Sequence, residues 1–238
     1  MSSAIVTGAA AGNGLAIARK LRERGHIVIG VDLAPIPVES CNHSVQGSVL
    51  DQATIDAAFA YALAASPAVY LVNNAGITFG GFPQPDDVWE KTIDVNLTAP
   101  FRWARFYGEQ VVAKRITEGA IVFVGSLATS MGFPKNAAYQ ASKSGVLGLT
   151  RSFAFDLGRY GIRCNCVSPG YIVTAMTQIS YNTPELNAAR RKHTLLDRWG
   201  QPEDVANGVA FLCDPSSAYV TGINLPVDGG WMVCGLIE

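Results

Sequence analysis

The chain has 238 residues, of which 49% are hydrophobic and only 16% are charged. A composition this apolar excludes intrinsic disorder and predicts a large buried core. The 18 basic and 19 acidic residues give a net charge of −1, so there is no basic excess with which to hold nucleic acid or an anionic membrane surface.

In chain order, short β-rich segments alternate with longer helical ones. We expect strands at Ser3–Thr7, Ile27–Asp32, Val69–Asn73, Ala120–Gly125, Arg163–Ser168 and Asn224–Val227. Between them we expect helices at Gly14–Arg24, Gln52–Ala65, Asn136–Tyr160 and Glu203–Leu212, and a mostly helical segment at Asp87–Arg115. Near-continuous apolar strands in this order are typical of a parallel sheet with helices on both faces. The sequence predicts an α/β fold, a doubly wound three-layer αβα sandwich, in one domain over residues 1–238.

Two regions break this alternation. Pro35 and Pro37 follow the second strand, and the fixed φ of proline argues against a full crossover helix there. The segment Gly170–Leu196 carries apolar and aromatic residues without a regular period. A long insertion after a strand end is typical of a lid or binding loop. We therefore expect a substrate loop at about residues 170–200.

The sequence also bears on the compartment. The first residues, MSSAIVTGAAAG, have no basic region before the apolar stretch, which argues against a signal peptide. The apolar runs are shorter than the roughly 18–20 residues that cross a bilayer. An odd number of cysteines, five, fits a reducing compartment, and the three histidines lack metal-ligand spacing. We expect a cytoplasmic protein with no bound metal.

A glycine-rich turn joins the first strand to the first helix. It reads TGAAAGNG, in which Gly8, Gly12 and Gly14 have the spacing G-x-x-x-G-x-G. Glycines let the backbone approach a pyrophosphate, and a helix N-terminus offers free N–H groups. Asp32 ends the second strand, where its carboxylate can accept both hydroxyls of an adenosine ribose. Taken singly, these residues also fit an ordinary glycine turn and a turn-forming Asp.

Tyr139 and Lys143 lie four residues apart in the long predicted helix, so they share a face. A Tyr phenol, with a pKa of about 10, is a poor acid–base group at neutral pH, and a neighbouring ammonium group lowers that pKa. Ser126 stands at the C-terminal end of an apolar strand, where functional groups of parallel sheets gather. A surface Tyr–Lys pair and a Ser in a turn are the plainer alternatives.

Asparagines mark two more positions. The segment Asn73-Asn74-Ala75-Gly76 follows an apolar strand, where Asn side chains bond the backbone and Gly allows a close approach. Asn96, in DVNLTAPF, interrupts an otherwise helical stretch. An amide at such a position indicates a bound water or a local kink, and otherwise a side chain that faces solvent.

Taken together, in order and at this spacing, these segments resemble the short-chain dehydrogenase/reductase family. The resemblance rests on TGAAAGNG, Asp32, NNAG, Asn96, Ser126, YQASK, SPGYIVT and, at residues 227–231, VDGGW. It covers nearly the whole chain. It implies a Rossmann-like single domain that binds a nicotinamide dinucleotide.

The resemblance also implies roles for single residues. The implied cofactor site consists of Thr7, Gly8, Gly12, Asn13, Gly14, Asp32, Asn73, Ala75, Gly76, Tyr139, Lys143, Pro169, Gly170, Ile172 and Thr174. The implied catalytic set is Asn96, Ser126, Tyr139 and Lys143. In this set Tyr139 exchanges a proton with the substrate oxygen, and Lys143 bonds the nicotinamide ribose and lowers the Tyr pKa. Ser126 positions the substrate oxygen and Asn96 holds a relay water.

Four positions bear on how the cofactor would be held. Ser48 stands where many family members have an Asp beside the adenine, and Asn13 replaces a usual apolar residue of the glycine turn. Leu33 stands where a phosphate-binding relative often supplies Arg or Lys. The negative charge of Asp32 would repel a 2′-phosphate. We therefore expect NAD as the cofactor.

We expect an NAD-dependent oxidoreductase that moves a hydride between a small secondary alcohol and the nicotinamide ring, giving a ketone. The first alternative is a 3-oxoacyl-[acyl-carrier-protein] reductase that uses NADPH, for which the candidate carrier-docking residues are Arg102, Arg105, Lys114 and Arg115. The second alternative is a dinucleotide-sensing module without turnover. The complete set Ser126, Tyr139 and Lys143 argues against that module.

The predicted helix at Asn136–Tyr160 has two distinct faces. One face carries Tyr139, Lys143, Val146, Thr150, Phe153 and Leu157, and the opposite face carries Ala137, Ala141, Ser144, Gly148, Ser152 and Phe155. Small residues permit close helix packing, and an aromatic residue can be a buried anchor. A plain surface face is the alternative. We expect a homo-oligomer, a tetramer or a dimer, built on this helix.

The substrate loop carries both apolar and charged residues. Its apolar and aromatic members are Tyr171, Met176, Ile179 and Tyr181, which predict a partly apolar pocket. The charged run is Arg190, Arg191 and Lys192. Such a run either meets an anionic group or faces water, and we favour the solvated helix face because most charge runs are of that kind.

Overall fold

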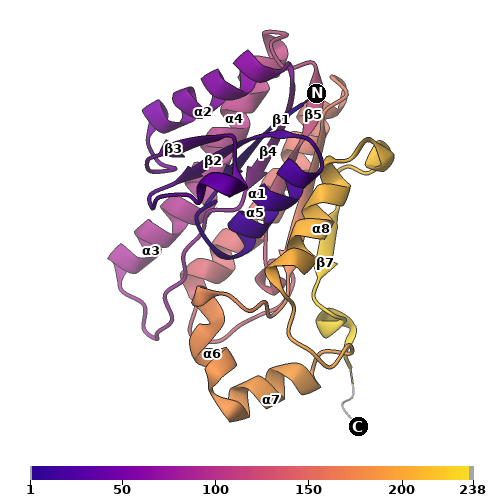
Figure 1. The fold of residues 1–238 in the computed structure, drawn as a ribbon. Helices are drawn as coiled ribbons and strands as arrows, with labels where there is room; N and C mark the ends of the chain where they lie inside the picture. The colour runs from indigo at the N-terminus through magenta and orange to yellow at the C-terminus, as the bar shows by residue number, and fades with distance from the viewer. Residues whose placement is uncertain (1, 236–238) are drawn as a thin grey trace.

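A computed structural model, which describes residues 2–235, contains one parallel sheet of seven strands with helices on both sides (Figure 1). The strand order is β3-β2-β1-β4-β5-β6-β7. The strands are β1 (Ser3–Thr7), β2 (Ile27–Asp32), β3 (His43–Gln46), β4 (Ala68–Asn73), β5 (Glu118–Val124), β6 (Arg163–Pro169) and β7 (Asn224–Val227). The helices are α1 (Gly12–Glu23), α2 (Gln52–Ala65), α3 (Asp86–Ile93), α4 (Ala99–Val112), α5 (Ala137–Gly158), α6 (Gln178–Asn182), α7 (Pro184–Lys192) and α8 (Pro202–Cys213). The predicted α/β, Rossmann-like, three-layer fold is confirmed.

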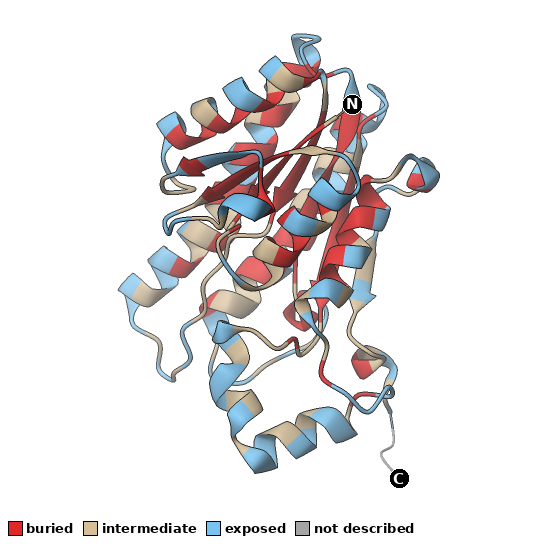
Figure 2. Cartoon of the chain, in the orientation of Figure 1, coloured by how far each residue is buried: buried red, intermediate tan, exposed pale blue. Residues whose placement is uncertain are grey.

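Two hydrophobic cores lie on the two faces of the sheet. Helices α2, α4 and α5 cover the first face, where Phe59, Trp103 and Val146 are buried, and α1 and α8 cover the second (Figure 2). Because successive side chains of a strand point to opposite faces, Ile121 belongs to the first core and Val122 to the second. Strands buried on both faces explain the near-continuous apolar runs in the sequence.

The register lines up buried side chains across the strands. Ile5 pairs with Ile29 on one side and Leu71 on the other, and Leu71 pairs with Ile121. All four side chains are fully buried, and each contributes roughly 1.5–3 kcal/mol of hydrophobic stabilisation. A slip of one residue would turn this row to the opposite face, so packing specifies the register.

The strand order reverses at β1, and this reversal places the candidate site. From β1 the chain builds β2 and β3 on one side, and then returns to pair β4 with β1 on the other. Loops that leave neighbouring strands in opposite directions open a crevice at the carboxyl ends of those strands. The segments that follow β1 and β4, residues 8–11 and 74–76, meet at this crevice.

The region after β2 differs from the prediction in one element. Strand β3 was not expected, because its sequence HSVQ is polar and only Val45 is buried. A strand at a sheet edge needs only one buried contact, so it lacks an apolar run. The chain before it contains a three-residue 3₁₀ turn, Val38–Ser40, and no longer helix, as Pro35 and Pro37 predict.

The expected helix at Asp87–Arg115 is divided into α3 and α4 by a π-helical turn, Asp94–Thr98. Asn96 lies in this turn and is 1% exposed. The predicted local irregularity is therefore confirmed, and the alternative of a solvent-facing side chain is wrong. Pi-helical turns are often found at functional sites.

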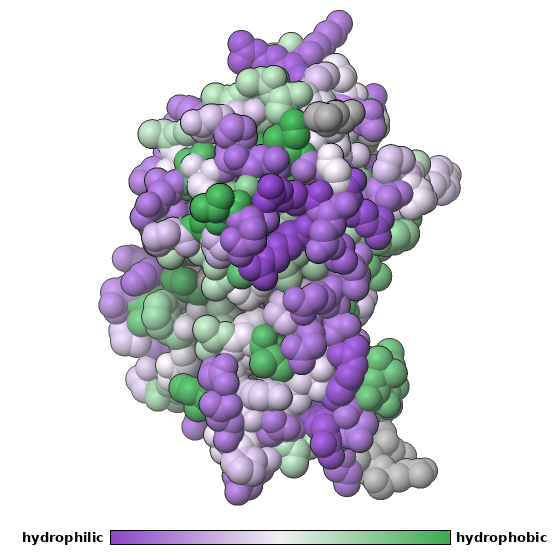
Figure 3. Space-filling model, in the orientation of Figure 1, coloured by the Kyte–Doolittle hydropathy of each residue, from purple (hydrophilic) through white to green (hydrophobic). Residues whose placement is uncertain are grey.

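Within residues 2–235, none of the helices has both the length and the apolar character needed to span a bilayer. Figure 3 shows one face, on which hydrophilic residues dominate around α1 and hydrophobic residues form small separate patches. No group of three or more metal-ligating side chains is gathered within the same residues.

Candidate active site

The glycine turn brings bare backbone to the crevice. Gly8 and Gly12 have φ values of +70° and +53°, which residues with side chains rarely adopt. At Gly14 a Cβ atom would lie 1.9 Å from the Gly8 carbonyl oxygen, so no side chain fits. Ala11 precedes α1, and none of the side chains of residues 2–235 caps this helix start. Its first N–H groups can therefore hold an anion such as a pyrophosphate.

Two polar atoms at the crevice lack partners within the described chain. They are the buried Asn13 Oδ1, in the glycine turn, and Asn73 Nδ2, at the end of β4. Asn73 also lines a small hollow together with Thr7, Val49 and Val95. Because buried polar groups normally have hydrogen-bond partners, both atoms fit a site that receives a polar ligand. The glycine turn and these two amides together are compatible with a dinucleotide.

Asn74 ties the ends of β1 and β4 together. Its side-chain amide donates to the carbonyl oxygens of Thr7, at 2.9 Å, and Gly8, at 3.2 Å. The Thr7 hydroxyl accepts from the N–H groups of Asn74 and Ala75, at 3.0 and 3.1 Å. The expected bonding of an Asn side chain to the backbone in this segment is confirmed at Asn74, although Asn74 was not among the predicted site residues. Its signal was the second Asn of NNAG, whose contacts are visible only once the two strands are neighbours.

Asp32 lies against the glycine turn, at the end of β2. Its Oδ2 accepts from the N–H of Ala10 at 2.9 Å, and its Oδ1 accepts from the N–H of Ala34 at 3.0 Å. These bonds fix the carboxylate beside the proposed cofactor crevice. The position is the one that a ribose-binding carboxylate requires.

Gly76, Asn96 and Lys143 come together around one point. A Cβ atom on Gly76 would lie 3.3 Å from Asn96 Oδ1 and 3.5 Å from Lys143 Nζ. Lys143 is 5% exposed, donates to the carbonyl oxygen of Val124 at 2.8 Å, and lies 5.7 Å from the centre of the Tyr139 ring. The structure thus gathers residues from four separate segments of the sequence.

Burial shifts the pKa values of the two central groups. It raises the pKa of the Tyr139 phenol, and a hydrogen bond with Ser126 opposes that rise. It lowers the pKa of Lys143 from 10.5 to about 8. The expected lowering of the Tyr139 pKa by Lys143 does not hold in this structure, because burial of the phenol outweighs the other influences. The ammonium group instead bonds the Val124 carbonyl.

The start of α5 is anchored by two glutamines. Gln84 Oε1 accepts from the N–H of Ala138 at 2.9 Å, and Gln140 Nε2 donates to the carbonyl oxygen of Ala128 at 2.6 Å. Ala128 belongs to the 3₁₀ turn Leu127–Thr129, which begins after Ser126. These bonds fix the helix end that carries Tyr139. The sequence interpretation assigned no role to Gln84 or Gln140.

The Asn96 side chain is bound to the chain next to Gly76. Its Oδ1 accepts from the N–H of Ile77 and its Nδ2 donates to the carbonyl oxygen of Ile77, both at 2.8 Å. Nδ2 also lies 3.2 Å from the Ser142 hydroxyl. Both ends of the amide are thus engaged by protein, so the side chain holds the segment after β4 in place.

The segment after β6 reaches across to the glycine turn. Gly170 is packed so closely that a Cβ atom would lie 2.7 Å from the Cα of Asp228. Ile172 is buried and forms a bridge with Gly200. A Cβ atom on Gly12 would lie 3.4 Å from the Thr174 methyl group. Pro169 ends β6, so the four predicted residues of this segment lie within six consecutive positions that begin at the end of that strand.

The three cations of the charged run have different surroundings. Arg191 Nε forms an exposed ion pair with Asp197 at 3.0 Å, and Lys192 is exposed. Arg190 instead lies with its guanidinium 4.7 Å from the centre of the Tyr171 ring, and its Nε is buried. The solvated interpretation therefore holds for Arg191 and Lys192 and is wrong for Arg190.

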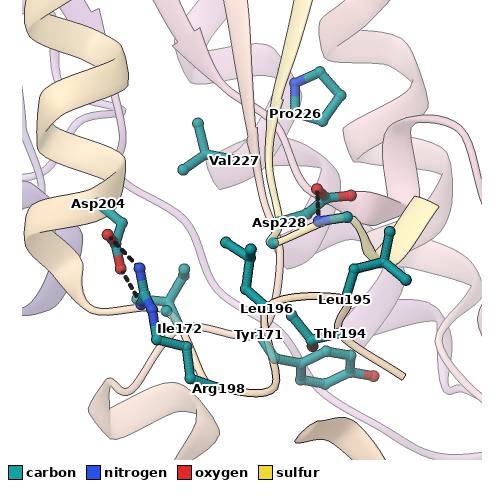
Figure 4. Close-up of a pocket in the computed structure, with 13 residues that line it drawn as sticks. Tyr171, Ile172, Thr194, Leu195, Leu196, Arg198, Asp204, Pro226, Val227 and Asp228 are labelled. Carbon is teal, nitrogen blue, oxygen red and sulfur yellow. Dashed lines mark hydrogen bonds and ion pairs between the residues drawn. The ribbon is translucent and has the colours of Figure 1, made fainter. Parts of the chain in front are cut away.

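A cavity of about 430 Å³ lies behind this segment, between α8 and the end of β7. Figure 4 shows that Arg198 and Asp204 face each other on one side of it. Their two bonds, at 2.7 and 3.0 Å, leave neither charge unpaired. Its described lining residues include Tyr171 and Ile172, which follow β6, and none of the four candidate catalytic residues.

Comparison with known proteins gives the family. The family model described as "Enoyl-(Acyl carrier protein) reductase" matches residues 8–232. The chain is 36% identical to 2-(R)-hydroxypropyl-CoM dehydrogenase of Xanthobacter autotrophicus, over 96% of this chain and 97% of that protein. It is also 36% identical to a 3-oxoacyl-[acyl-carrier-protein] reductase of Vibrio cholerae, over 95% and 96% of the two chains.

Solved structures of similar fold are also dehydrogenases. The aldohexose dehydrogenase of Thermoplasma acidophilum superposes with a TM-score of 0.91 at 28% identity, and the match covers 100% of this chain and 96% of that one. Among other similar structures, two hold NADP and another, 4-hydroxyisoleucine dehydrogenase, is complexed with NADH. The chain belongs to the short-chain dehydrogenase/reductase family.

Proposed function

We propose that this protein is an NAD-dependent oxidoreductase that interconverts a secondary alcohol and a ketone. The observation that carries the proposal is the arrangement beside the glycine-lined crevice, where Lys143 Nζ lies 5.7 Å from the centre of the Tyr139 ring and Gln140 bonds the helix of Tyr139 to the turn that begins at Ser126. Relatives at 36% identity include enzymes named as a dehydrogenase and a reductase, which supports this reaction type.

Each residue at the crevice would have its own role in the reaction. The bound nicotinamide supplies the hydride chemistry. In alcohol oxidation, Tyr139 takes the hydroxyl proton while the carbon-bound hydrogen leaves as hydride, and Ser126 holds the substrate oxygen. Lys143, whose Nζ lies 5.7 Å from the centre of the Tyr139 ring, would hold the cofactor ribose and stabilise the phenolate. Acid–base help of this kind is worth roughly 10²–10⁴-fold in rate.

The cofactor preference rests on Asp32. Its carboxylate is fixed beside the glycine turn by the N–H groups of Ala10 and Ala34, and the exposed Leu33 follows it. A negative charge there accepts ribose hydroxyls and repels a 2′-phosphate. Among residues 2–235, the nearby helix cations are engaged elsewhere, since Arg19 pairs with Glu39.

The test is turnover of a panel of secondary alcohols and ketones with NAD(H) and NADP(H). We expect a change in absorbance at the reduced-nicotinamide band with at least one member of the panel, and a faster reaction with NAD(H). Binding of NADH without turnover of any alcohol or ketone would instead support the dinucleotide-sensing module.

A carrier-protein reductase is the second candidate, favoured by the Vibrio cholerae relative at 36% identity. Arg102 and Arg105 are exposed on α4 and could meet an acidic carrier, although Arg105 pairs with Glu109 at 2.8 Å. Reduction of an acetoacetyl thioester, and a preference for NADPH in that reaction, would select this candidate.

The assembly and the compartment belong to the same proposal. The exposed α5 face, with Gly148 and Phe155, supports a homotetramer or a dimer, and we propose that residues 170–200 cover the substrate. All five cysteines are free thiols, four of them buried, which fits the reducing cytoplasm.

A further inference from the structure

Of the three cations in the last turn of α7, Arg190 has surroundings unlike those of Arg191 and Lys192. Arg190 ends its side chain against the Tyr171 ring, at 4.7 Å, whereas Arg191 pairs with Asp197 and Lys192 faces solvent. Within residues 2–235, no Asp or Glu forms an ion pair with Arg190, and its buried Nε has no acceptor. A partly desolvated cation without a counter-charge is costly, so a ligand that supplied one would be bound favourably.

An aromatic cluster holds Arg190 in this position. Tyr171 packs against Trp199 at 5.5 Å and against Trp231 at 4.7 Å between ring centres, and His193 packs on Trp231 at 4.3 Å. Because the Tyr171 ring is fixed on two sides, the guanidinium that lies over it has a defined place. An arginine ordered in this way loses little entropy when it binds a ligand.

The pairing of β5 with β6 relates Tyr171 to the predicted site of chemistry. Val167 of β6 pairs with Val124 of β5, and the Gly125 N–H donates to the Val167 carbonyl oxygen at 2.7 Å. Ser126 and Tyr171 therefore follow the carboxyl ends of two neighbouring parallel strands, β5 and β6. Helix α7, which carries Arg190, lies beyond the carboxyl end of the sheet, at the bottom of Figure 1. A substrate whose oxygen meets Ser126 can extend toward Tyr171.

We propose that Arg190 binds a carboxylate group on the substrate, so that the enzyme prefers hydroxy acids or keto acids over neutral alcohols and ketones. The planar guanidinium fork matches the two oxygens of a carboxylate. This inference rests on the proposed function, because it assigns specificity to the same site. Two features of the lid, the orphaned Nε and the ring that positions it, are explained by such a ligand.

The test compares acids with their neutral esters. The probes are 2-hydroxybutyrate, 3-hydroxybutyrate and 4-hydroxypentanoate, each beside its methyl ester, which keeps the reacting carbon and removes the charge. We expect wild type to have a higher kcat/KM for at least one acid than for its ester. In Arg190→Gln the acid-to-ester ratio should fall at least tenfold, and in the matched control Arg191→Gln it should not change. Arg190→Lys, which keeps charge but not the fork, should fall in between.

Two outcomes would overturn the inference. One is a wild type that shows no preference for any acid, and the other is an equal loss for acid and ester in Arg190→Gln, which would indicate a structural role. If no alcohol or ketone is turned over, the proposed function fails, and binding alone decides. Butyrate, titrated by tryptophan fluorescence with NADH present, should then bind wild type and Arg191→Gln at least tenfold more tightly than Arg190→Gln; equal affinities refute the role of Arg190.

Discussion

The side chain of Gln140 donates a hydrogen bond to the carbonyl oxygen of Ala128 over 2.6 Å. This bond joins the helix that carries Tyr139 to the turn that begins at Ser126. Within residues 2–235 the Gln140 side chain is hydrogen-bonded to neither Tyr139 nor Ser126, yet it fixes the separation of the two segments that carry them. Misplacing catalytic groups by about 1 Å can cost up to 10²-fold in rate.

Gln140→Met should therefore lower kcat by about tenfold while KM for the cofactor changes little. The methionine keeps the length of the side chain and removes the donor. Steady-state kinetics measure the split, and Gln52→Met, on the exposed start of α2, is the matched control. Wild-type kcat in Gln140→Met would show that the bond does not position Tyr139.

Tyr139→Phe keeps the ring and removes the transferable proton. We expect turnover to fall by at least ~10²-fold, while NADH still binds with little change. Rapid kinetics measure turnover, and fluorescence titration measures NADH binding. Tyr160→Phe, at an exposed position two residues after the end of α5, is the control. Activity close to wild type in Tyr139→Phe would refute the proposed proton transfer.

Lys143 gives a pH signature in stability. Its pKa is about 8 in the folded chain and 10.5 when exposed, so between these values the unfolded chain binds more protons and wild-type stability rises with pH. Lys143→Met should lack this rise. Because the variant does not bury an ammonium group, we expect it to have a higher free energy of unfolding than wild type. This difference should be greatest below pH 8 and should shrink by roughly 3 kcal/mol toward pH 10.5.

Chemical denaturation at pH 7 and pH 10 measures that difference. The raised pKa of Tyr139 affects both proteins and largely cancels in the comparison. The same variant should lose turnover and bind NADH more weakly, because the ammonium group is expected to bond the cofactor ribose. A stability difference that did not depend on pH would contradict the lowered pKa of Lys143.

The sequence predicts the features that depend on local patterns and misses those that depend on contacts between distant segments. An apolar run such as Ile121–Val124 predicts a buried strand, and the spacing of Tyr139 and Lys143 predicts a shared helix face. The strand β3 could not be foreseen in the same way, because its pairing with β2 needs no apolar run.

The charged run of the substrate loop is a second feature that the sequence could not resolve. Arg190 and Arg191 are adjacent in the sequence, and nothing in that run tells them apart. Their surroundings differ because one side chain reaches the Tyr171 ring and the other reaches Asp197, and both contacts depend on the tertiary fold. The pKa of Tyr139 was misjudged for a similar reason, since its burial is a property of the assembled site.

The outer face of α5 supports a prediction about assembly. Phe155 is 87% exposed in the single chain, and the space around Gly148 is open, with no described atom within 4 Å of a Cβ placed there. Gly148→Arg should therefore be harmless to the isolated fold but should block close packing of another helix. Light scattering should show a smaller species than wild type. Ala60→Arg, exposed on α2, is the control, and an unchanged mass in Gly148→Arg would argue against this interface.

Asp32 decides the last prediction, on the choice of cofactor. Both its oxygens already accept backbone N–H groups, so its negative charge is fixed beside the glycine turn. The cations of α1 are engaged by partners, Arg19 by Glu39 at 2.7 Å, Lys20 by Glu23 at 3.0 Å and Arg22 by the Glu39 carbonyl oxygen. A desolvated contact between like charges costs several kcal/mol, and each ~1.4 kcal/mol is tenfold. We therefore expect wild type to prefer NAD(H) by at least ~10²-fold in kcat/KM.

Asp32→Asn with Leu33→Arg should shrink or invert that preference. The asparagine removes the charge while keeping an acceptor for one backbone N–H, so the glycine turn is less disturbed than in an alanine variant. The arginine, at a position that is 71% exposed in wild type, supplies a partner for the 2′-phosphate. Asp32→Asn alone separates the two effects, since it removes repulsion without adding attraction. Steady-state kinetics with both cofactors decide the outcome: equal efficiency or a preference for NADP(H) in wild type would mean that Asp32 does not face the ribose, and that Arg19 or Lys20 leaves its partner to bind the phosphate.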